Sequence, residues 1–394
     1  MDPFDSILNK IAVRGTDDAE KNSLLERYRA WLATADPDAA RAVAARAAVR
    51  FVTSPRGLDG IDEQDTIALA TLRCALTACV ASIVPGDKVV RDAATEAAAK
   101  YDKIVGYIRS GTSNKRSYSA GRTGVLVSFA ACAACARDDH AEYALRAMYY
   151  EPRSTNAVSY AATDQDLFDV EEGSAELFKS SLWQGFEDDL LTGHMISGEY
   201  WSDAPKNWAF WEGWYGGMLE GKPLPWDLQR DVALIEDEVW EAGAEAVSEK
   251  IAEIEARHRL STTLQDAQTE IVRSYSQRSG IGGNNPPEAI DDLPPIPKAL
   301  EVVWEPLADL KDQVGEETPD ASVIKSAIQK LTGLIAACGS WTGGKLDAAA
   351  TEFAKSVGKW GGPAFIAWLT THVPALERVL VAAKEWLVAL LNLA

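Results

Sequence analysis

The chain has 394 residues, of which 47% are hydrophobic and 25% are charged, so it can supply the cores of two or three globular domains. Its net charge of −20 is uneven, because residues 151–277 hold 26 acidic and 9 basic side chains whereas residues 1–150 are almost neutral. This acidity argues against nucleic acid as a partner, since phosphates would be repelled. A solvated acidic surface explains it, and the alternatives are a nucleic-acid mimic or a dock for a basic partner.

The first residues lack the basic start and apolar run of a secretory signal. No stretch reaches the roughly 18 consecutive apolar residues without charge that mark a membrane-spanning helix. We therefore expect a cytoplasmic protein, with peripheral contact at the inner membrane as the alternative.

Residues 1–150 predict an alanine-rich helical domain. Asp36 and Pro37 have the form of an N-cap followed by a first helical residue. Apolar periodicity predicts helices over 19–33, 37–52, 64–84, 92–108, 125–137 and 139–150.

Between the fourth and fifth of these helices, residues 109–124 read RSGTSNKRSYSAGRTG and predict an exposed loop. The segment has turn-forming residues throughout and no acidic residue. It lacks the G-x-x-x-x-G-K-[ST] order of a phosphate-binding P-loop. The side chains that could still contact a phosphate are Arg109, Lys115, Arg116 and Arg122.

Four of the five cysteines lie in alanine-rich apolar runs: Cys74, Cys79, Cys132 and Cys135. Their spacings of five and three residues suit the inner faces of helices, which predicts buried apolar cysteines. A four-thiolate zinc site is the alternative. We predict no bound metal and no cofactor.

Residues 151–277 predict an acidic helical region, in which seven of the thirteen tryptophans fall between positions 183 and 240. Trp208, Trp211 and Tyr215 follow helical spacing and give one helix an aromatic face, and Trp214 lies off that face. Core packing explains such a face, and a recognition surface for a partner is the alternative. In that case Trp208, Trp211, Trp214 and Tyr215 would bind, with Trp214 the best candidate for exposure. Residues 227–243 and 244–276 then predict a helical hairpin.

The glycine cluster that follows predicts a flexible linker over residues 278–298. It has no third glycine in the register of a dinucleotide-binding loop, and tandem prolines prevent an immediate helix with free amides for a phosphate. The linker residues are Gly280, Gly282, Gly283, Asn284, Asn285, Pro286 and Pro287.

Residues 299–394 predict an apolar helical module. Thr318 and Pro319 resemble the start of one helix, and residues 346–360 form a second amphipathic pattern. Residues 361–394 are apolar on almost every side, with Leu376, Leu380, Ala383, Leu387 and Leu390 on one face. Such a segment is buried in a bundle, inserts into a membrane in the manner of helical pore-forming toxins, or mediates oligomerisation.

No catalytic constellation stands out. The four histidines have no companion at metal-ligand spacing, and there is no G-x-S-x-G motif. Adjacent carboxylates such as Glu171 and Glu172 point in different directions on a helix, so they do not form an acid–base pair. We expect no enzymatic activity, with a hydrolase assembled from dispersed residues as the alternative.

The element IGGNNPPE resembles the I-G-H-N-N-P-P element of a group of alphaproteobacterial hypothetical proteins. The similarity runs roughly over residues 157–288 and includes the stretch WEGWYGGMLEGKP; Gly283 stands where those proteins have histidine. The resemblance implies a helical, tryptophan-containing N-terminal portion joined by this linker to a variable C-terminal module. It also implies that the element is a recognised peptide or a processing site, and it implies no activity.

We therefore predict an all-α protein in which an N-terminal sensing or docking region is tethered to a C-terminal effector module. The expected function is a non-enzymatic effector, of a toxin or defence kind, whose residues 361–394 contact a membrane or self-associate. The alternative function is a soluble scaffold for protein–protein interaction.

Overall fold

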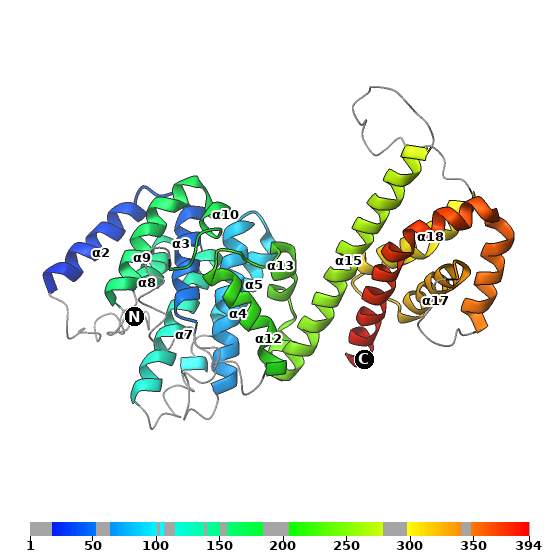
Figure 1. Cartoon of the computed structure of the whole chain (residues 1–394). Helices are drawn as coiled ribbons and strands as arrows, with labels where there is room; N and C mark the ends of the chain where they lie inside the picture. Colours follow the sequence, from blue (N-terminus) through cyan, green and yellow to red (C-terminus); the bar gives the residue numbers. More distant parts are fainter. Residues whose placement is uncertain are drawn as a thin grey trace. The chain divides into compact units, whose positions relative to one another are not determined.

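The computed structural model describes residues 18–52, 64–100, 103–105, 115–137, 140–149, 156–183, 205–278, 298–339 and 348–393. Every regular element in these ranges is helical (Figure 1), so the predicted all-α class is confirmed. The chain forms two compact units, Met1–Ser248 and Glu249–Ala394, here called unit 1 and unit 2.

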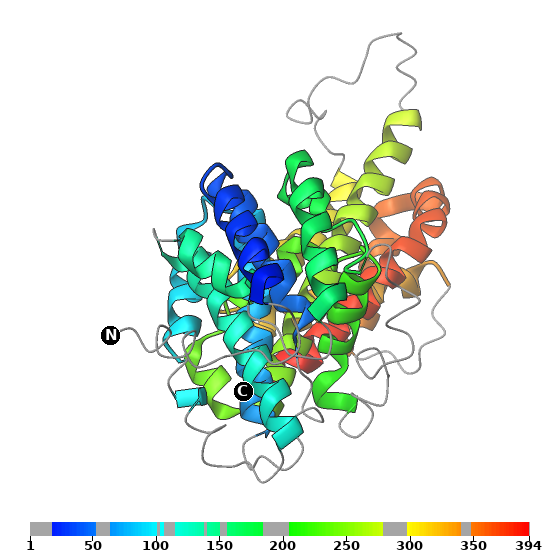
Figure 2. The ribbon, with the colours of Figure 1, turned by 90° about the vertical axis from the view of Figure 1, so that its left-hand side faces the viewer.

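Unit 1 is a cluster of helices around α4, which packs against α3, α5 and α7. Helix α2 lies at the outer edge beside α8 (Figures 1 and 2). The elements are α2 (Asp18–Leu32), α3 (Pro37–Arg50), α4 (Gln64–Ile83), α5 (Lys88–Ala99), α7 (Lys115–Ala136), α8 (His140–Tyr149), α9 (Asn156–Asp169), the 3-10 helix η2 (Val170–Glu172), α10 (Ser174–Leu177), α12 (Pro205–Leu219), α13 (Trp226–Ala233) and α14 (Asp237–Ala242).

Two aspartates define helix starts in unit 1. The Asp36 side chain accepts a hydrogen bond from the backbone N–H of Asp38 at 2.8 Å, with Pro37 at the first helical position, as the sequence predicts. Asp87 caps α5 in the same way and also accepts a 2.8 Å hydrogen bond from Arg230 of α13. The second cap therefore fixes the position of α13 as well as the start of α5.

The predicted loop over residues 109–124 is wrong from Lys115 onward, and residues 109–114 lie outside the described part of the chain. Residues from Lys115 onward belong to α7, which packs against α3, α4, α5 and α8. The packing of the rest of α7 supports a helix that extends back to Lys115 in spite of the weak helix propensity of the serines and glycines there. Lys115, Arg116 and Arg122 therefore lie on a helix, and Arg109 lies outside the described residues. Contact of these four residues with a phosphate stays a prediction.

The described residues of unit 2 form four helices around one apolar core. They are α15 (Ala244–Arg278), whose first five residues belong to unit 1, α16 (Lys298–Gly315), α17 (Ala321–Ala337) and α18 (Ala348–Asn392). Leu260, Leu264 and Ile271 of α15 are buried in the same core as Leu307, Leu331 and Leu376. Most of the helix that the sequence assigns to the acidic region therefore packs with the C-terminal module.

Two boundaries in unit 2 differ from the predicted ones. Helix α17 is capped by Asp320, which accepts from Ser322 N at 2.7 Å, so the helix starts two residues after the predicted Pro319. The segments predicted as separate C-terminal helices form one 45-residue helix, α18. Its ribbon bends sharply in Figure 1, and Gly361, Gly362 and Pro363 within it favour a kink.

The predicted linker lies almost wholly outside the described residues. Arg278 is the last residue of α15 and Lys298 the first of α16. The residues between them that stay a sequence prediction include Gly280, Gly282, Gly283, Asn284, Asn285, Pro286 and Pro287.

Candidate functional site

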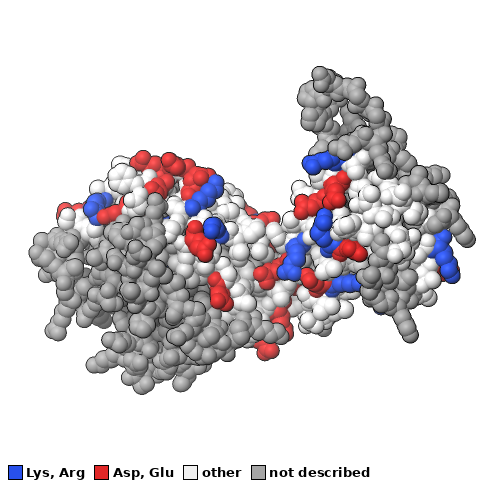
Figure 3. Space-filling view, in the orientation of Figure 1, with Lys and Arg blue, Asp and Glu red and all other residues white. Residues whose placement is uncertain are grey.

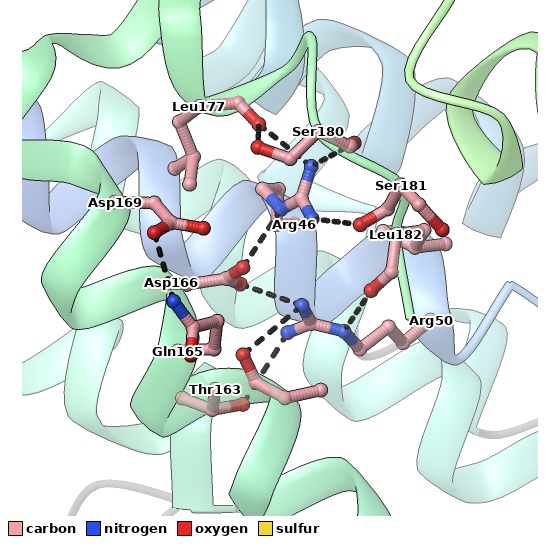
Figure 4. A network of polar contacts seen from close by, with 11 residues as sticks. Arg46, Arg50, Thr163, Gln165, Asp166, Asp169, Leu177, Ser180, Ser181 and Leu182 are labelled. Atoms are coloured by element: carbon pink, nitrogen blue, oxygen red, sulfur yellow. Dashed lines mark hydrogen bonds and ion pairs between the residues drawn. The ribbon is translucent and has the colours of Figure 1, made fainter. Parts of the chain in front are cut away.

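The interior of unit 1 contains a pair of buried arginines on α3 that share one carboxylate (Figure 4). Arg46 and Arg50 are one helical turn apart, and their side chains are only 2% and 1% exposed. Arg46 Nε lies 3.0 Å from Oδ1 of Asp166, and Arg50 Nη2 lies 2.7 Å from Oδ2 of the same side chain. Asp166, on α9, is itself 2% exposed. Two cations and one anion thus leave a net positive charge inside the unit.

Backbone carbonyls offset this excess charge. Arg46 donates to the carbonyls of Leu177 at 2.9 Å, Ser180 at 3.1 Å and Ser181 at 2.8 Å. Arg50 donates to the carbonyl of Leu182 at 3.0 Å. Burial lowers the pKa of Arg46, and the charge of Asp166 opposes that shift. The two arginines therefore donate to four backbone carbonyls around the turn after α10, which makes them structural residues.

Residues 179–182, which the arginines of α3 contact, also pack closely against a glycine that follows α12. Gly221 follows α12 with a φ of 67°, and a Cβ atom there would collide with the backbone of Lys179 and Ser180. The backbone N–H of Leu182 also donates to the carbonyl of Leu219 at 3.1 Å. Residues 179–182 are thus fixed between α3 and the end of α12.

A shallow, open hollow lies at the surface beside this turn. Its carboxylates are Asp169, Glu172 and Glu176, with Lys179 as the one cation among the lining residues. Phe168 is 76% exposed there. Acidic side chains gather over this part of unit 1 in Figure 3. The other lining residues are Gln165, Ser180 and Ser181, so this hollow has carboxylates and hydroxyls but no histidine.

The predicted aromatic face belongs to the core. Trp208, Trp211, Trp214 and Tyr215 are all buried. The expectation that Trp214 is exposed is wrong, because its side chain is 0% exposed and its Nε1 donates to Gln229 Oε1 at 2.9 Å. Gln229, at 0% exposure, donates in turn to the carbonyl of Leu224 at 2.7 Å. Gln229 of α13 thus covers Trp214, which lies on the face of α12 that the sequence pattern predicts to be exposed.

The four cysteines of unit 1 are also in the core, on α4 and α7. The Cys132 thiol donates to the carbonyl of Ala94 at 3.3 Å, and the Cys135 thiol donates to Ala78 at 3.6 Å. Burial raises the pKa of both Cys79 and Cys135, which favours the neutral thiol over the thiolate that zinc needs. Among the described residues there is no group of three or more side chains that could hold a metal ion.

Unit 2 presents a different kind of surface, on the last part of α18. Val381, Val388 and Leu391 are 56%, 59% and 57% exposed, and we call these three residues the α18 stripe. The opposite face of the helix is buried, and there Trp386 donates from Nε1 to Oε1 of the buried Glu253 on α15 at 2.8 Å. The stripe is therefore apolar surface left over after the core is complete.

In the described part of the chain two helices are long and apolar enough to cross a membrane by length and composition, although both contain charged residues, so neither is the uncharged stretch that the sequence lacks. Asp65–Ile83 is 83% buried in the centre of unit 1, as the core helix of a globular domain is. Phe365–Asn392 is 50% buried. Length and composition alone do not make either a membrane span, but the second has a face that remains accessible.

No protein-family model, curated protein or solved structure matches the chain. The hollow on unit 1 and the α18 stripe on unit 2 are the surface features of the described residues that suit a partner. The sequence pattern identifies the buried face of α18 but not the hollow, whose residues come from α9, η2, α10 and the turn after α10.

Proposed function

We propose that the protein is a non-enzymatic helical effector that acts through the α18 stripe of its C-terminal module. The observation that carries the proposal is the exposure of three large aliphatic side chains on one face of a helix whose opposite face builds the core. Exposed aliphatic residues that line up on one helix face are characteristic of association surfaces. The proposal extends to a role for this effector as a toxin or a defence protein.

Self-association has more support than membrane insertion as the action of the stripe. Insertion of residues 365–392 would remove Trp386 from the core and separate it from Glu253. It would also carry Lys384 and Glu385, which lie between the apolar residues of the stripe, into hydrocarbon. Association of two protein surfaces keeps the core intact and lets these charges stay hydrated or paired. A cytoplasmic location, or a peripheral one at the inner membrane, fits both actions.

The first prediction concerns the stripe. Val388→Lys is expected to weaken self-association of the full chain by more than about tenfold, because it places a charge at the centre of the apolar surface. Sedimentation velocity over a range of protein concentrations measures this effect. Melting should be unchanged, since Val388 is exposed.

The matched control is Val89→Lys, because Val89 on α5 of unit 1 is 57% exposed and should leave association unchanged. Flotation with anionic phospholipid vesicles separates the two actions of the stripe. Binding of the wild type to vesicles, with a monomeric protein in solution, would favour the membrane. A wild type that is monomeric and does not bind vesicles would refute the proposal.

A second candidate function is docking of a basic partner, and the exposure of Phe168 within the acidic hollow favours it. An aromatic side chain surrounded by carboxylates suits a polypeptide that carries lysine or arginine next to an apolar residue. In the soluble-scaffold alternative, the tryptophans cannot be the docking site because they are buried. The docking site is then the surface formed by α9, η2 and α10.

The second prediction tests this hollow with a fluorescent Lys-Lys-Leu-Phe-Lys-Lys peptide and its glutamate counterpart. Glu172→Lys and Phe168→Ser are each expected to weaken binding of the basic peptide by about tenfold at low salt. Fluorescence anisotropy measures the affinity. The controls are Glu96→Lys and Val89→Ser. They make the same kinds of substitution, acidic to basic and apolar to serine, at exposed residues of α5. Equal loss in the controls would show non-specific attraction to an acidic protein and would contradict the docking site.

A further inference from the structure

The exposed face of α18 has an apolar centre line with one row of side chains along each edge. Val381 and Val388 are seven residues apart, which is almost two full turns, so they lie on one line along the helix. Because each residue advances the helix by about 100°, the positions three and four residues away from a valine lie on opposite sides of this line. Leu391 belongs to one of these edges, three residues after Val388.

The two edges carry opposite charges at the same levels of the helix. The exposed residues of the first edge are Glu377, Lys384 and Leu391, and those of the second edge are Arg378, Glu385 and Asn392. Each member of the first edge directly precedes its neighbour on the second edge, so the two lie within about 1.5 Å of each other along the helix axis. The acid of the first edge is therefore level with a base of the second, and the base of the first edge is level with an acid of the second.

A two-fold axis that runs parallel to α18 exchanges the two edges between copies. It sets the first edge of one copy beside the second edge of the other at the same level, and each valine faces its own counterpart. Glu377 then lies beside Arg378 of the second copy, and Lys384 lies beside Glu385 of the second copy. Each of these pairs occurs twice, because an isologous contact uses the same patch on both subunits.

We propose that the partner of the α18 stripe is a second copy of this chain, with the two α18 helices packed parallel and in register about a two-fold axis. The inference rests on the proposed self-association and specifies its geometry. The observation that carries it is the opposite charge of the two edges at two successive levels. A face that is complementary to itself at both levels fits a second copy of the same face and closes at a dimer.

Antiparallel pairing suits this face less well, because it keeps each edge beside the same edge of the second copy. Centred between Lys384 and Glu385, an antiparallel pair places like charges together, which is unfavourable. Centred on Val381, it would pair opposite charges, but Val388 would then lie opposite Pro374. Of these arrangements, the parallel one alone matches the charges and also sets both valines of the stripe against valines.

The second edge is already held in position by α15. Arg378 pairs with Glu270 at 3.1 Å, and Glu385 pairs with Arg259 at 2.5 Å. Both ion pairs are partly exposed, a guanidinium has five N–H donors, and a carboxylate can accept from more than one donor. The first edge of a second copy can therefore add a bond to each pair without breaking it. Side chains that are ordered before association lose less entropy when the partner binds.

The size of the face sets the expected strength. The exposed part of the helix from Glu377 to Leu393 is about 24 Å long, so the interface is at the small end for specific contacts. We therefore expect a reversible dimer with a dissociation constant on the order of 1 to 100 µM.

A charge exchange tests the parallel arrangement, with Arg259→Gln as the common background so that the ion pair within the chain does not change. Lys384→Glu and Glu385→Lys are each expected to weaken the dimer of the full chain by about tenfold, because each places like charges beside one another. The double variant Lys384→Glu/Glu385→Lys restores opposite charges and should return the dissociation constant to within about threefold of the background. In the antiparallel pair centred on Val381, the double variant would be weaker than either single. Sedimentation velocity measures all four proteins.

Cysteine cross-linking gives an independent readout in a Cys338→Ser background. Val388→Cys chains should form a disulfide with one another under a mild oxidant, because the parallel axis sets position 388 of one copy against position 388 of the other. In an antiparallel pair centred on Val381 the two positions would lie far apart. Val89→Cys on α5, which replaces a side chain that is 57% exposed, is the control for random collision.

The outcomes separate the geometry from the self-association on which it rests. A dimer in which Val388→Cys chains cross-link no better than the control would overturn the parallel arrangement but not self-association. A double charge variant that is weaker than the singles would do the same. A wild type that remains monomeric, or a dimer insensitive to Val388→Lys, would overturn the role of the stripe itself.

Discussion

Replacing Asp166 with alanine is expected to lower the free energy of unfolding of unit 1 by about 3 to 5 kcal/mol. The variant leaves Arg46 and Arg50, which are 2% and 1% exposed, without their shared carboxylate. The carbonyl contacts of the two arginines remain, but neutral carbonyls do not replace a counterion for a buried charge, so the cost exceeds that of a surface ion pair several-fold. A loss of this size is a large fraction of the stability of a typical domain.

The matched control is on the same helix, two residues earlier. Asp164 pairs with Arg27 at 2.6 Å, where the side chains are 36% and 54% exposed, and it also hydrogen-bonds the buried Tyr28, so Asp164→Ala should cost about 1 to 2 kcal/mol, clearly less than Asp166→Ala. Urea unfolding followed by hydrogen exchange in α3 and α9 reports on unit 1 separately from unit 2. Equal losses in the two variants would contradict the role assigned to the buried pair.

A triple replacement of Arg46, Arg50 and Asp166 by apolar residues distinguishes two explanations of the network. Buried ion pairs can often be replaced by apolar residues of similar volume without loss of stability. Here the arginines also donate to the carbonyls of Leu177, Ser180, Ser181 and Leu182. The Leu177 carbonyl keeps the backbone N–H and hydroxyl of Ser180 as donors, but all four carbonyls lose their arginine contacts, so the triple variant is expected to be no more stable than Asp166→Ala. Recovery of wild-type stability would show that the carbonyl contacts contribute little.

Local signals in the sequence were sufficient for the fold class and for many helix boundaries. An aspartate followed by proline defines the start of α3, because both residues act within one helical turn. The repeat of Ile324, Ile328, Leu331 and Ile335 identifies the buried face of α17 for the same reason. Such features depend on neighbours a few residues away and are accessible without a structure.

The arginine network depends on partners far along the chain and was not predicted. Arg46 and Asp166 are 120 residues apart, and nothing local relates them. One signal was present, since both arginines lie in an alanine-rich run that has no room for a broad polar face. That pattern indicates buried arginines and hence a buried carboxylate, but not which carboxylate.

The α18 stripe was only partly predictable. The sequence places Leu376, Leu380 and Ala383 on one face, and the structure buries all three. Because the helix is apolar on almost every side, the pattern did not show which aliphatic residues remain outside. The packing of α15, α16 and α17 against one side of α18 leaves Val381, Val388 and Leu391 exposed on the other.

Trp214→Ala is expected to cost unit 1 about 3 to 5 kcal/mol, because the ring is fully buried and its loss leaves a large cavity. The ring packs edge-on against Trp211, with centroids 5.9 Å apart, and Trp211 lies 6.3 Å from Trp240. Loss of one ring therefore weakens contacts within a whole aromatic cluster. A recognition residue would behave differently, since its replacement removes a partner and leaves stability almost unchanged.

Two further variants separate packing from hydrogen bonding at this position. Trp214→Phe keeps most of the ring but leaves Gln229 Oε1 without its donor, which should cost about 1 to 3 kcal/mol. Gln229→Leu leaves both the Trp214 N–H and the Leu224 carbonyl unpaired, so it should cost at least as much. The double variant should be less destabilised than the sum of the singles, because neither member of the Trp214–Gln229 pair then remains unsatisfied. Strict additivity in the double variant would mean that α13 is held against α12 by packing alone. For Trp214→Ala, wild-type stability would contradict the burial of Trp214.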